Sequence, residues 1–182
     1  PSLRMFSLLL FLLAVTHAKK LPDIHWNSTN PMMERCGAVD DMVNIVCPHG
    51  KPEYSVIYRV SKAEYDECIL GDEAKMIGRC ERPKEHINLK VAFRSRSPNP
   101  YALVYKPGET YYFISTSTGA KDGVEEKRGG LCTTHALKLK MTLVERGGDC
   151  PLVHHSKRKH HHHHRTATTT TTERITVEGD TV

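Results

Sequence analysis

The stretch Leu137-Lys-Leu-Lys-Met-Thr-Leu143 alternates apolar and polar side chains without a break. Successive side chains of a β-strand point to opposite faces of a sheet, so a period of two buries one face and leaves the other in water. The same alternation runs from Ile87 to Phe93. These two stretches therefore predict strands, each with one face in a core.

Shorter runs around these stretches predict further strands. Val56–Val60 and Tyr111–Ile114 are rich in β-branched and aromatic residues, which favour strands. Turn residues separate the runs, at Pro48, Gly50, Pro52, Pro98, Pro100, Pro107, Gly108, Gly129 and Gly130. Short strands with such connections are typical of an all-β domain, either an antiparallel sandwich or a Greek-key barrel.

One helical turn is predicted within this β pattern. Ser61 is a favourable N-cap residue, and Glu64 three positions later completes a capping box. The turn is expected to end near Cys68. We therefore predict an all-β fold with one or two short helical turns.

An apolar run near the start predicts a secretory signal peptide over residues 1–18. Met5–Val15 is apolar apart from one serine, and small residues stand at Thr16 and Ala18 ahead of Lys19. We expect cleavage after Ala18. The run is shorter than the roughly 18–20 apolar residues that a membrane-spanning helix needs.

Lys157, Arg158, Lys159 and Arg165 supply four positive charges in one short segment of a chain whose net charge is +5. Residues 19–150 hold 20 basic and 18 acidic side chains, a balance of +2, which is not the basic surface of a nucleic-acid binder. Residues 151–182 contain Lys157-Arg-Lys159, five consecutive histidines and a threonine run. This composition predicts a disordered basic, His- and Thr-rich stalk after one folded domain.

Six cysteines in an exported domain predict disulfides. They are Cys36, Cys47, Cys68, Cys80, Cys132 and Cys150. Six cysteines allow 15 pairings, and the spacing does not choose among them. The sequon Asn27-Ser-Thr29 also predicts N-glycosylation of Asn27.

A possible copper site has to be weighed against those disulfides. The order His…Cys-x2-His-x5-Met supplies the two imidazoles, thiolate and axial thioether of a blue-copper electron carrier. The residues concerned are His86, Cys132, His135 and Met141. The thiolate has to be free to bind copper. Because an exported domain favours bridged cysteines, the electron carrier is the alternative function rather than the first.

Several ordered motifs resemble the ephrins, cell-surface ligands of Eph receptor tyrosine kinases. They span roughly residues 21–143 and include four of the cysteines. The motifs are Leu21-Pro-Asp-Ile-His-Trp-Asn-Ser-Thr-Asn-Pro31, Asn44-Ile-Val-Cys-Pro48, Val60-Ser-Lys-Ala-Glu-Tyr-Asp-Glu-Cys68, Arg79-Cys-Glu-Arg-Pro83, Tyr111-Tyr-Phe-Ile-Ser-Thr-Ser117 and Gly129-Gly-Leu-Cys-Thr-Thr-His135.

The resemblance implies a cupredoxin-like Greek-key fold that binds no copper. It also implies the bridges Cys47–Cys80 and Cys68–Cys132. Cys36 and Cys150 depart from the family pattern, and because they flank the domain we hypothesise that they form a third bridge between neighbouring terminal strands. Residues 19–150 would then be the receptor-binding domain.

The resemblance further implies that a long loop, residues 95–106, binds the receptor. The expected contact residues are Ser97, Pro98, Asn99, Pro100, Tyr101, Ala102, Leu103, Val104 and Tyr105. The two prolines reduce the entropy lost on binding, and Tyr101, Leu103 and Tyr105 offer aromatic and apolar anchors. Arg96, Ala102 and Val104 depart from the residues usual in the family.

The expected function is therefore that of a ligand, secreted or held on the outer face of the plasma membrane if an anchor lies downstream. Its expected partner is an Eph-type receptor ectodomain, with self-association or clustering at cell contacts. It needs no cofactor or metal and no nucleic acid, and this chain contains no membrane anchor. No nucleophile elbow, phosphate-binding loop or HExxH motif occurs, so nothing in the sequence points to an enzyme.

Overall fold

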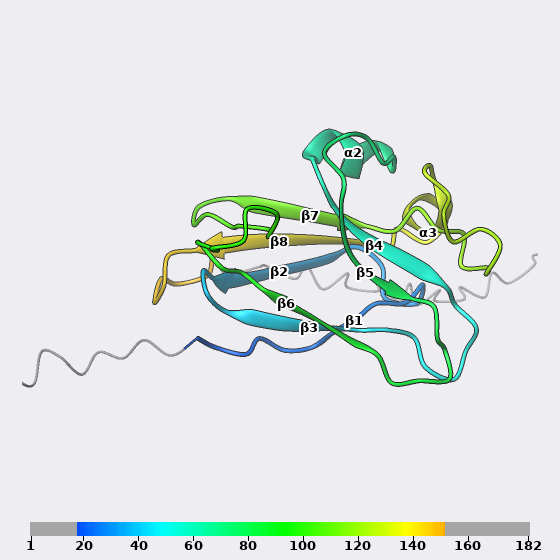
Figure 1. Cartoon of the computed structure of the whole chain (residues 1–182), viewed down its shortest axis with the longest axis horizontal. Helices are drawn as coiled ribbons and strands as arrows, with labels where there is room; N and C mark the ends of the chain where they lie inside the picture. Colours follow the sequence, from blue (N-terminus) through cyan, green and yellow to red (C-terminus); the bar gives the residue numbers. More distant parts are fainter. Residues whose placement is uncertain (1–17, 152–182) are drawn as a thin grey trace, which may run out of the picture.

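Two β-sheets lie face to face in the computed structural model, which describes residues 18–151 (Figure 1). One sheet has three strands in the order β1-β3-β6, and the other has five in the order β2-β8-β7-β4-β5. The elements are β1 (Ile24–His25), β2 (Met33–Ala38), β3 (Met42–Val46), β4 (Ser55–Val60), α2 (Lys62–Glu67), β5 (Lys75–Cys80), β6 (Asn88–Ala92), β7 (Thr110–Ile114), α3 (Gly130–Thr134) and β8 (Lys138–Val144).

Strand β8 lies inside the larger sheet, between β2 and β7. Its alternating apolar residues are almost completely buried, and the intervening Lys138, Lys140 and Thr142 are only partly covered. The prediction of a strand with one core face is confirmed here. It is also confirmed for β6, which covers most of the Ile87–Phe93 stretch.

The core fills the space between the two sheets. Trp26, Phe93, Tyr105 and Phe113 are its largest buried side chains. Aliphatic side chains from both sheets complete the same cluster, including Ile45 of β3 and Leu139 of β8. The all-β fold class with two short helices is therefore confirmed, and it takes the form of a Greek-key sandwich rather than a closed barrel.

The strands are not all antiparallel, which the sequence pattern did not predict. β1 pairs in parallel with β3, and β2 pairs in parallel with β8. A tight hairpin forces its two strands to be antiparallel, whereas strands joined by a long connection are free of that constraint. β2 and β8 are separated by nearly the whole domain, so no tight turn constrains their relative direction.

The predicted capping box at the start of α2 is confirmed. The Ser61 hydroxyl accepts a hydrogen bond from the Glu64 backbone N–H, and the Glu64 carboxylate accepts one from the Ser61 backbone N–H. Glu64 is 7% exposed and also accepts from the Gly71 N–H at 2.7 Å. Burial raises the pKa of Glu64, but these hydrogen bonds outweigh it and leave the pKa below its ordinary value.

All six cysteines form disulfides, with the pairs Cys36–Cys150, Cys47–Cys80 and Cys68–Cys132. These are the two pairs that the resemblance implies and the hypothesised third. Cys47–Cys80 links the segment after β3 to β5 and so connects the two sheets, while Cys68–Cys132 joins the end of α2 to α3. Cys36–Cys150 fixes the segment after β8 to β2.

The predicted leader and stalk lie outside the described residues, apart from Ala18 and Pro151 at their borders. Between residues 18 and 151 no helix is long and apolar enough to cross a bilayer.

Candidate functional site: the loop between β6 and β7

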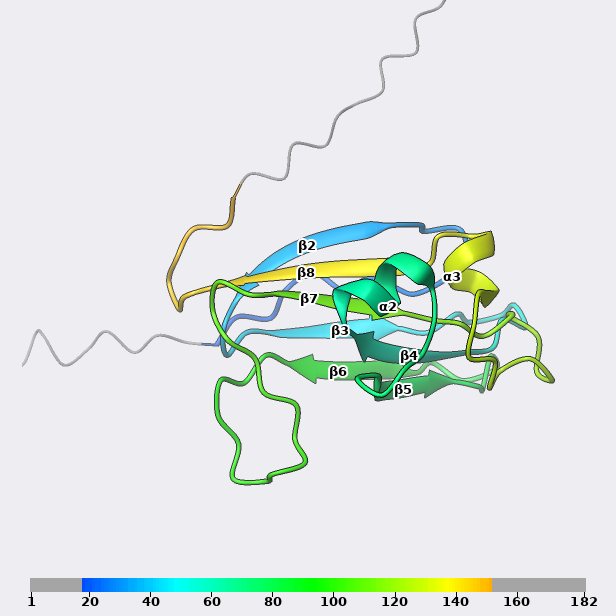
Figure 2. The same ribbon diagram turned by 90° about the horizontal axis from the view of Figure 1, so that it is seen from above.

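The loop that joins β6 to β7 projects from one end of the sandwich (Figure 2). Tyr101 is 92% exposed and Val104 is 44% exposed, which is unusual for large apolar side chains. Pro98, Asn99 and Pro100 are exposed as well, whereas Ser97, Ala102 and Leu103 are half-buried. The loop therefore presents an aromatic ring and apolar surface to its surroundings.

Hydrogen bonds within the loop hold Tyr101 at its tip. The Asn99 side-chain oxygen accepts from the Tyr101 N–H at 3.0 Å, and the Asn99 carbonyl accepts from the Ala102 N–H at 3.1 Å. The Ser97 hydroxyl accepts from the Asn99 N–H at 3.2 Å. Asn and Ser side chains stabilise turns in this way. The tip is thus ordered before any partner binds.

Tyr105 lies at the root of the loop and is 1% exposed. Its ring meets Phe93 and Tyr111 edge-on, with centroids 5.2 and 4.8 Å away. Burial raises the pKa of its hydroxyl. The expectation that the Tyr105 ring offers an anchor to a receptor is therefore wrong, because the ring is part of the core and fixes the loop to it.

Arg59 of β4 holds the returning limb of the loop. Its guanidinium lies 5.1 Å from the Tyr105 ring centre and 5.5 Å from that of Tyr111, and it donates to the Val104 carbonyl at 3.1 Å. The Lys106 N–H donates to the Tyr111 hydroxyl at 2.6 Å. We call Arg59, Tyr105 and Tyr111 the loop clamp.

Arg59 and the supporting role of Tyr111 were not predicted from the sequence. The one feature of the sequence that could have indicated Arg59 is the alternation of side chains along β4. Arg59 lies two residues after the buried Ile57, so its side chain is on the same, core-facing side of the strand. A charged residue on that side needs a partner. Which partner it finds depends on where the loop returns, and strand periodicity carries no information on that.

A shallow hollow of about 180 Å³ lies beside the root of the loop. Its lining combines Leu103 and Tyr105 of the loop with residues of β5 and β6, namely Met76, Ile77, Lys90, Val91 and Ala92. Met76 is 55% exposed. Apolar surface therefore continues from the loop onto the neighbouring strands.

The residues of the copper alternative do not form a metal site. Cys132 is bonded to Cys68, so the thiolate that copper requires is absent. Met141 is buried in the central core, while Cys132 belongs to a separate cluster under α2. His86 stacks on His49 with ring centres 3.7 Å apart, and His135 is exposed beside Thr134. The blue-copper hypothesis is therefore wrong.

The predicted glycosylation site lies in the turn after β1. The side-chain oxygen of Asn27 accepts hydrogen bonds from the backbone N–H and the hydroxyl of Thr29, at 3.1 and 2.6 Å. Asn27 is half-buried and Thr29 is exposed. Modification of Asn27 stays a prediction.

Comparison with known proteins identifies the family to which this fold and its disulfides belong. The family model described as Ephrin matches residues 17–143. The chain belongs to the ephrin family. The matched range contains the β6–β7 loop, the clamp and five of the six cysteines, including the four that were expected from the family pattern.

Relatives within the ephrin family come from vertebrates and nematodes. Ephrin-B1 of Gallus gallus is 33% identical over 139 residues, which covers 71% of this chain and 42% of that protein. Ephrin-4 of Caenorhabditis briggsae is 30% identical over 151 residues, which covers 66% of this chain and 42% of that protein. The chain thus spans about two fifths of the length of these relatives.

A solved structure of a human ephrin A2–ephrin A1 complex shares the fold. The TM-score is 0.52 at 23% sequence identity, and the match covers 70% of this chain and 99% of that chain. At this identity the likeness concerns the fold alone.

Proposed function

We propose that this ephrin-family chain is a non-enzymatic ligand that binds the ectodomain of an Eph-type receptor tyrosine kinase through residues 95–106. The observation that carries the proposal is the 92% exposure of Tyr101 at the tip of an ordered loop. A tyrosine side chain buries about 150–250 Å² when it is fully covered. Such a side chain is the type of residue that dominates the energy of an interface.

Within the loop and its surroundings, some residues would contact the receptor and others hold the loop in place. Tyr101, Leu103 and Val104 would enter or cover an apolar site on the receptor. Tyr105 and Arg59 keep the returning limb in place. Because the loop is already held in this way, less conformational entropy is lost when it binds. The apolar hollow beside Met76 extends the surface that a partner could cover.

The proposed mechanism is binding alone, with no chemical step. Residues 19–150 would form the receptor-binding domain, exported by the leader and followed by the stalk of residues 151–182. Several ligands held together at a cell contact would cluster receptors and switch on their kinase domains. Contact-dependent repulsion, adhesion and axon guidance are the responses that we infer for such a ligand.

The test is the affinity of residues 19–151 for an Eph ectodomain from the same organism. We expect Tyr101→Ala together with Leu103→Ala to raise Kd by more than about 30-fold, as loss of two central apolar anchors does at hot spots. Met32→Ala is the matched control, because Met32 is 62% exposed and lies far from the loop. The Met32 N–H donates to the Ala136 carbonyl just before β8 begins, whereas the chain leaves the loop beside Leu143 near the end of β8, where the Gly108 N–H donates to the Leu143 carbonyl. Unchanged binding by the double variant would exclude the loop as the contact.

A further inference from the structure

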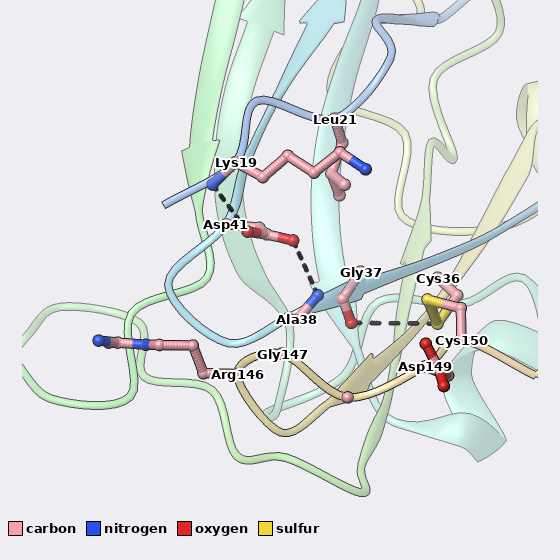
Figure 3. A pocket seen from close by; sticks show the side chains of 11 residues that line it. Lys19, Leu21, Cys36, Gly37, Ala38, Asp41, Arg146, Gly147, Asp149 and Cys150 are labelled. Atoms are coloured by element: carbon pink, nitrogen blue, oxygen red, sulfur yellow. Dashed lines mark hydrogen bonds between the residues drawn. A yellow bond between two sulfur atoms is a disulfide. The ribbon is translucent and has the colours of Figure 1, made fainter. Parts of the chain in front are cut away.

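The backbone nitrogen of Lys19 lies against a buried carboxylate, as Figure 3 shows. It donates to Asp41 Oδ1 at 2.9 Å, while Asp41 Oδ2 accepts from the Ala38 N–H at 2.9 Å. Asp41 is only 8% exposed. A buried carboxylate held by two neutral donors is costly to desolvate and is stabilised by a positive charge.

The position of the Lys19 nitrogen is fixed by the segment that follows it. The Lys19 carbonyl accepts from the Met42 N–H at 2.9 Å, and the Leu21 N–H donates to the Met42 carbonyl at 2.7 Å. Leu21 is buried at 9% exposure, and a Cβ added to Gly37 would lie 2.6 Å from its side chain. These contacts keep the start of the folded chain beside Asp41.

Lys19 is also the residue that follows the predicted signal-peptide cleavage site. We propose that cleavage after Ala18 turns the Lys19 nitrogen into an α-ammonium group that forms a buried ion pair with Asp41. Ala18 is exposed, so its removal sacrifices no core contact. The proposal rests on the predicted cleavage site and does not depend on receptor binding.

The chemistry of maturation balances with one water molecule. A leader peptidase hydrolyses the Ala18–Lys19 peptide bond, and the water oxygen joins the Ala18 carbonyl carbon, which leaves as a carboxylate. The Lys19 nitrogen keeps its hydrogen and gains both protons from the water, so it becomes –NH3⁺ at neutral pH. A neutral donor to Asp41 is thereby replaced by a charged one, and such hydrogen bonds are about twice as strong.

Other charged groups line the same hollow of about 480 Å³, including the Lys19 side chain, Arg146 and Asp149. Arg146 already forms an ion pair with the neighbouring Asp40. Arg146 therefore supplies a positive charge to Asp40, and the new N-terminus would supply one to Asp41.

The ion pair would act on the turn that holds the start of the β6–β7 loop. The Asp41 carbonyl accepts from the Phe93 N–H at 2.9 Å, and the Asp40 N–H donates to the Phe93 carbonyl at 2.8 Å. Phe93 is the first residue after β6 and lies two positions before Ser95, where the loop begins. Maturation would therefore stabilise the turn, the N-terminal segment and the loop root together.

The first test identifies, by mass spectrometry of the N-terminal peptide, the first residue of the protein that animal cells secrete when they express the full chain. A mature chain beginning at Lys19 supports the proposal. A mature chain that begins at any other residue overturns it, because no other α-amino group would reach Asp41.

The second test compares two purified chains that differ by one residue, one beginning at Lys19 and one at Ala18. In the longer chain residue 19 keeps a neutral amide, and the charge moves about 3.8 Å along the backbone. We expect the Lys19 chain to unfold roughly 2–5 °C higher, which for a domain of this size corresponds to about a fivefold larger folding equilibrium constant. Equal unfolding temperatures would overturn the proposal.

Two substitutions show whether Asp41 is the partner. Asp41→Asn should reduce the difference between the two chains to below about 1 °C, whereas Asp149→Asn, a carboxylate of the same hollow, should leave it unchanged. A difference that survives Asp41→Asn would contradict the assignment. If Asp41→Asn does not fold, the comparison of the two unsubstituted chains and the N-terminal mass still decide the proposal.

Discussion

The loop clamp makes a quantitative prediction for Arg59→Ala. The substitution removes the hydrogen bond to the Val104 carbonyl and the guanidinium contacts with Tyr105 and Tyr111. A cation–π contact at a partly exposed site is worth about 0.5–1 kcal/mol, and a hydrogen bond contributes about 0.5–1.5 kcal/mol net. The Arg59 side chain itself is not placed in contact with the receptor, so the variant tests how the loop is positioned.

Of the interaction energy that Arg59 contributes, only the part that holds the loop in its binding conformation affects the affinity for the receptor. We therefore expect Arg59→Ala to cost about 1 kcal/mol of binding free energy, a rise of roughly fivefold in Kd. Arg59→Lys should recover only part of the loss, because lysine lacks the planar group that stacks on both rings. Surface plasmon resonance with an Eph ectodomain measures Kd, and a thermal melt of each variant monitors folding.

Arg79→Ala is the matched control for this prediction. Arg79 lies on the neighbouring strand β5 and contacts Glu81 and Glu125, each at 2.6 Å, away from the loop. We expect its removal to leave Kd unchanged. The clamp hypothesis fails if Arg59→Ala binds as tightly as the unsubstituted chain, or if both arginine variants lose affinity equally.

Three further predictions concern stability. Hydrogen bonding lowers the pKa of Glu64 in the folded state, so its ionised form stabilises the fold above the ordinary carboxyl pKa of 4.5, and this stability is lost as the pH falls through the folded-state pKa. Glu64→Gln should therefore have a lower urea midpoint than the parent at pH 7, and its midpoint should depend less on pH below about pH 4.5. Gly130→Ala places a Cβ against the Thr116 carbonyl at a φ of +53°, so it should lower Tm by more than about 5 °C, and a melt within 1 °C of the parent would refute this. Replacing Cys36 and Cys150 together by serine opens a bridge across 114 residues and should cost about 2–4 kcal/mol in urea unfolding without reducing agent, and an unchanged urea midpoint would refute this.

The parts of the fold that local chemistry dictates could be predicted from the sequence. The alternation of Leu139 and Met141 with lysines predicts which face of β8 is buried, and the structure buries that face. The capping box from Ser61 to Glu64 is similarly local, since both hydrogen bonds join residues three positions apart.

The parts that depend on distant contacts could not be predicted in the same way. The parallel pairing of β2 with β8 joins opposite ends of the domain and leaves no local pattern. Tyr105 looks like an exposed loop residue in sequence, because it lies between Val104 and Lys106 after a Pro-rich tip. Its burial depends on Phe93, Tyr111 and Arg59, which come from three other places in the chain.

The number of cysteines predicted that disulfides form, but it did not predict which cysteines pair. Export and an even number of cysteines predicted that bridges form, but spacing allowed 15 pairings. The resemblance to a family supplied two pairs, and the hypothesis for Cys36 and Cys150 required that the two ends of the domain meet. They do meet, because β2 and β8 are neighbours in one sheet.

Hydrogen–deuterium exchange of residues 19–151, with and without a saturating Eph ectodomain, tests the central claim most directly. The account predicts that amides from Tyr101 to Lys106 become strongly protected on binding, while those of β2 at the far edge of the larger sheet do not change. Binding that protects β2 and leaves the loop amides unchanged would contradict it.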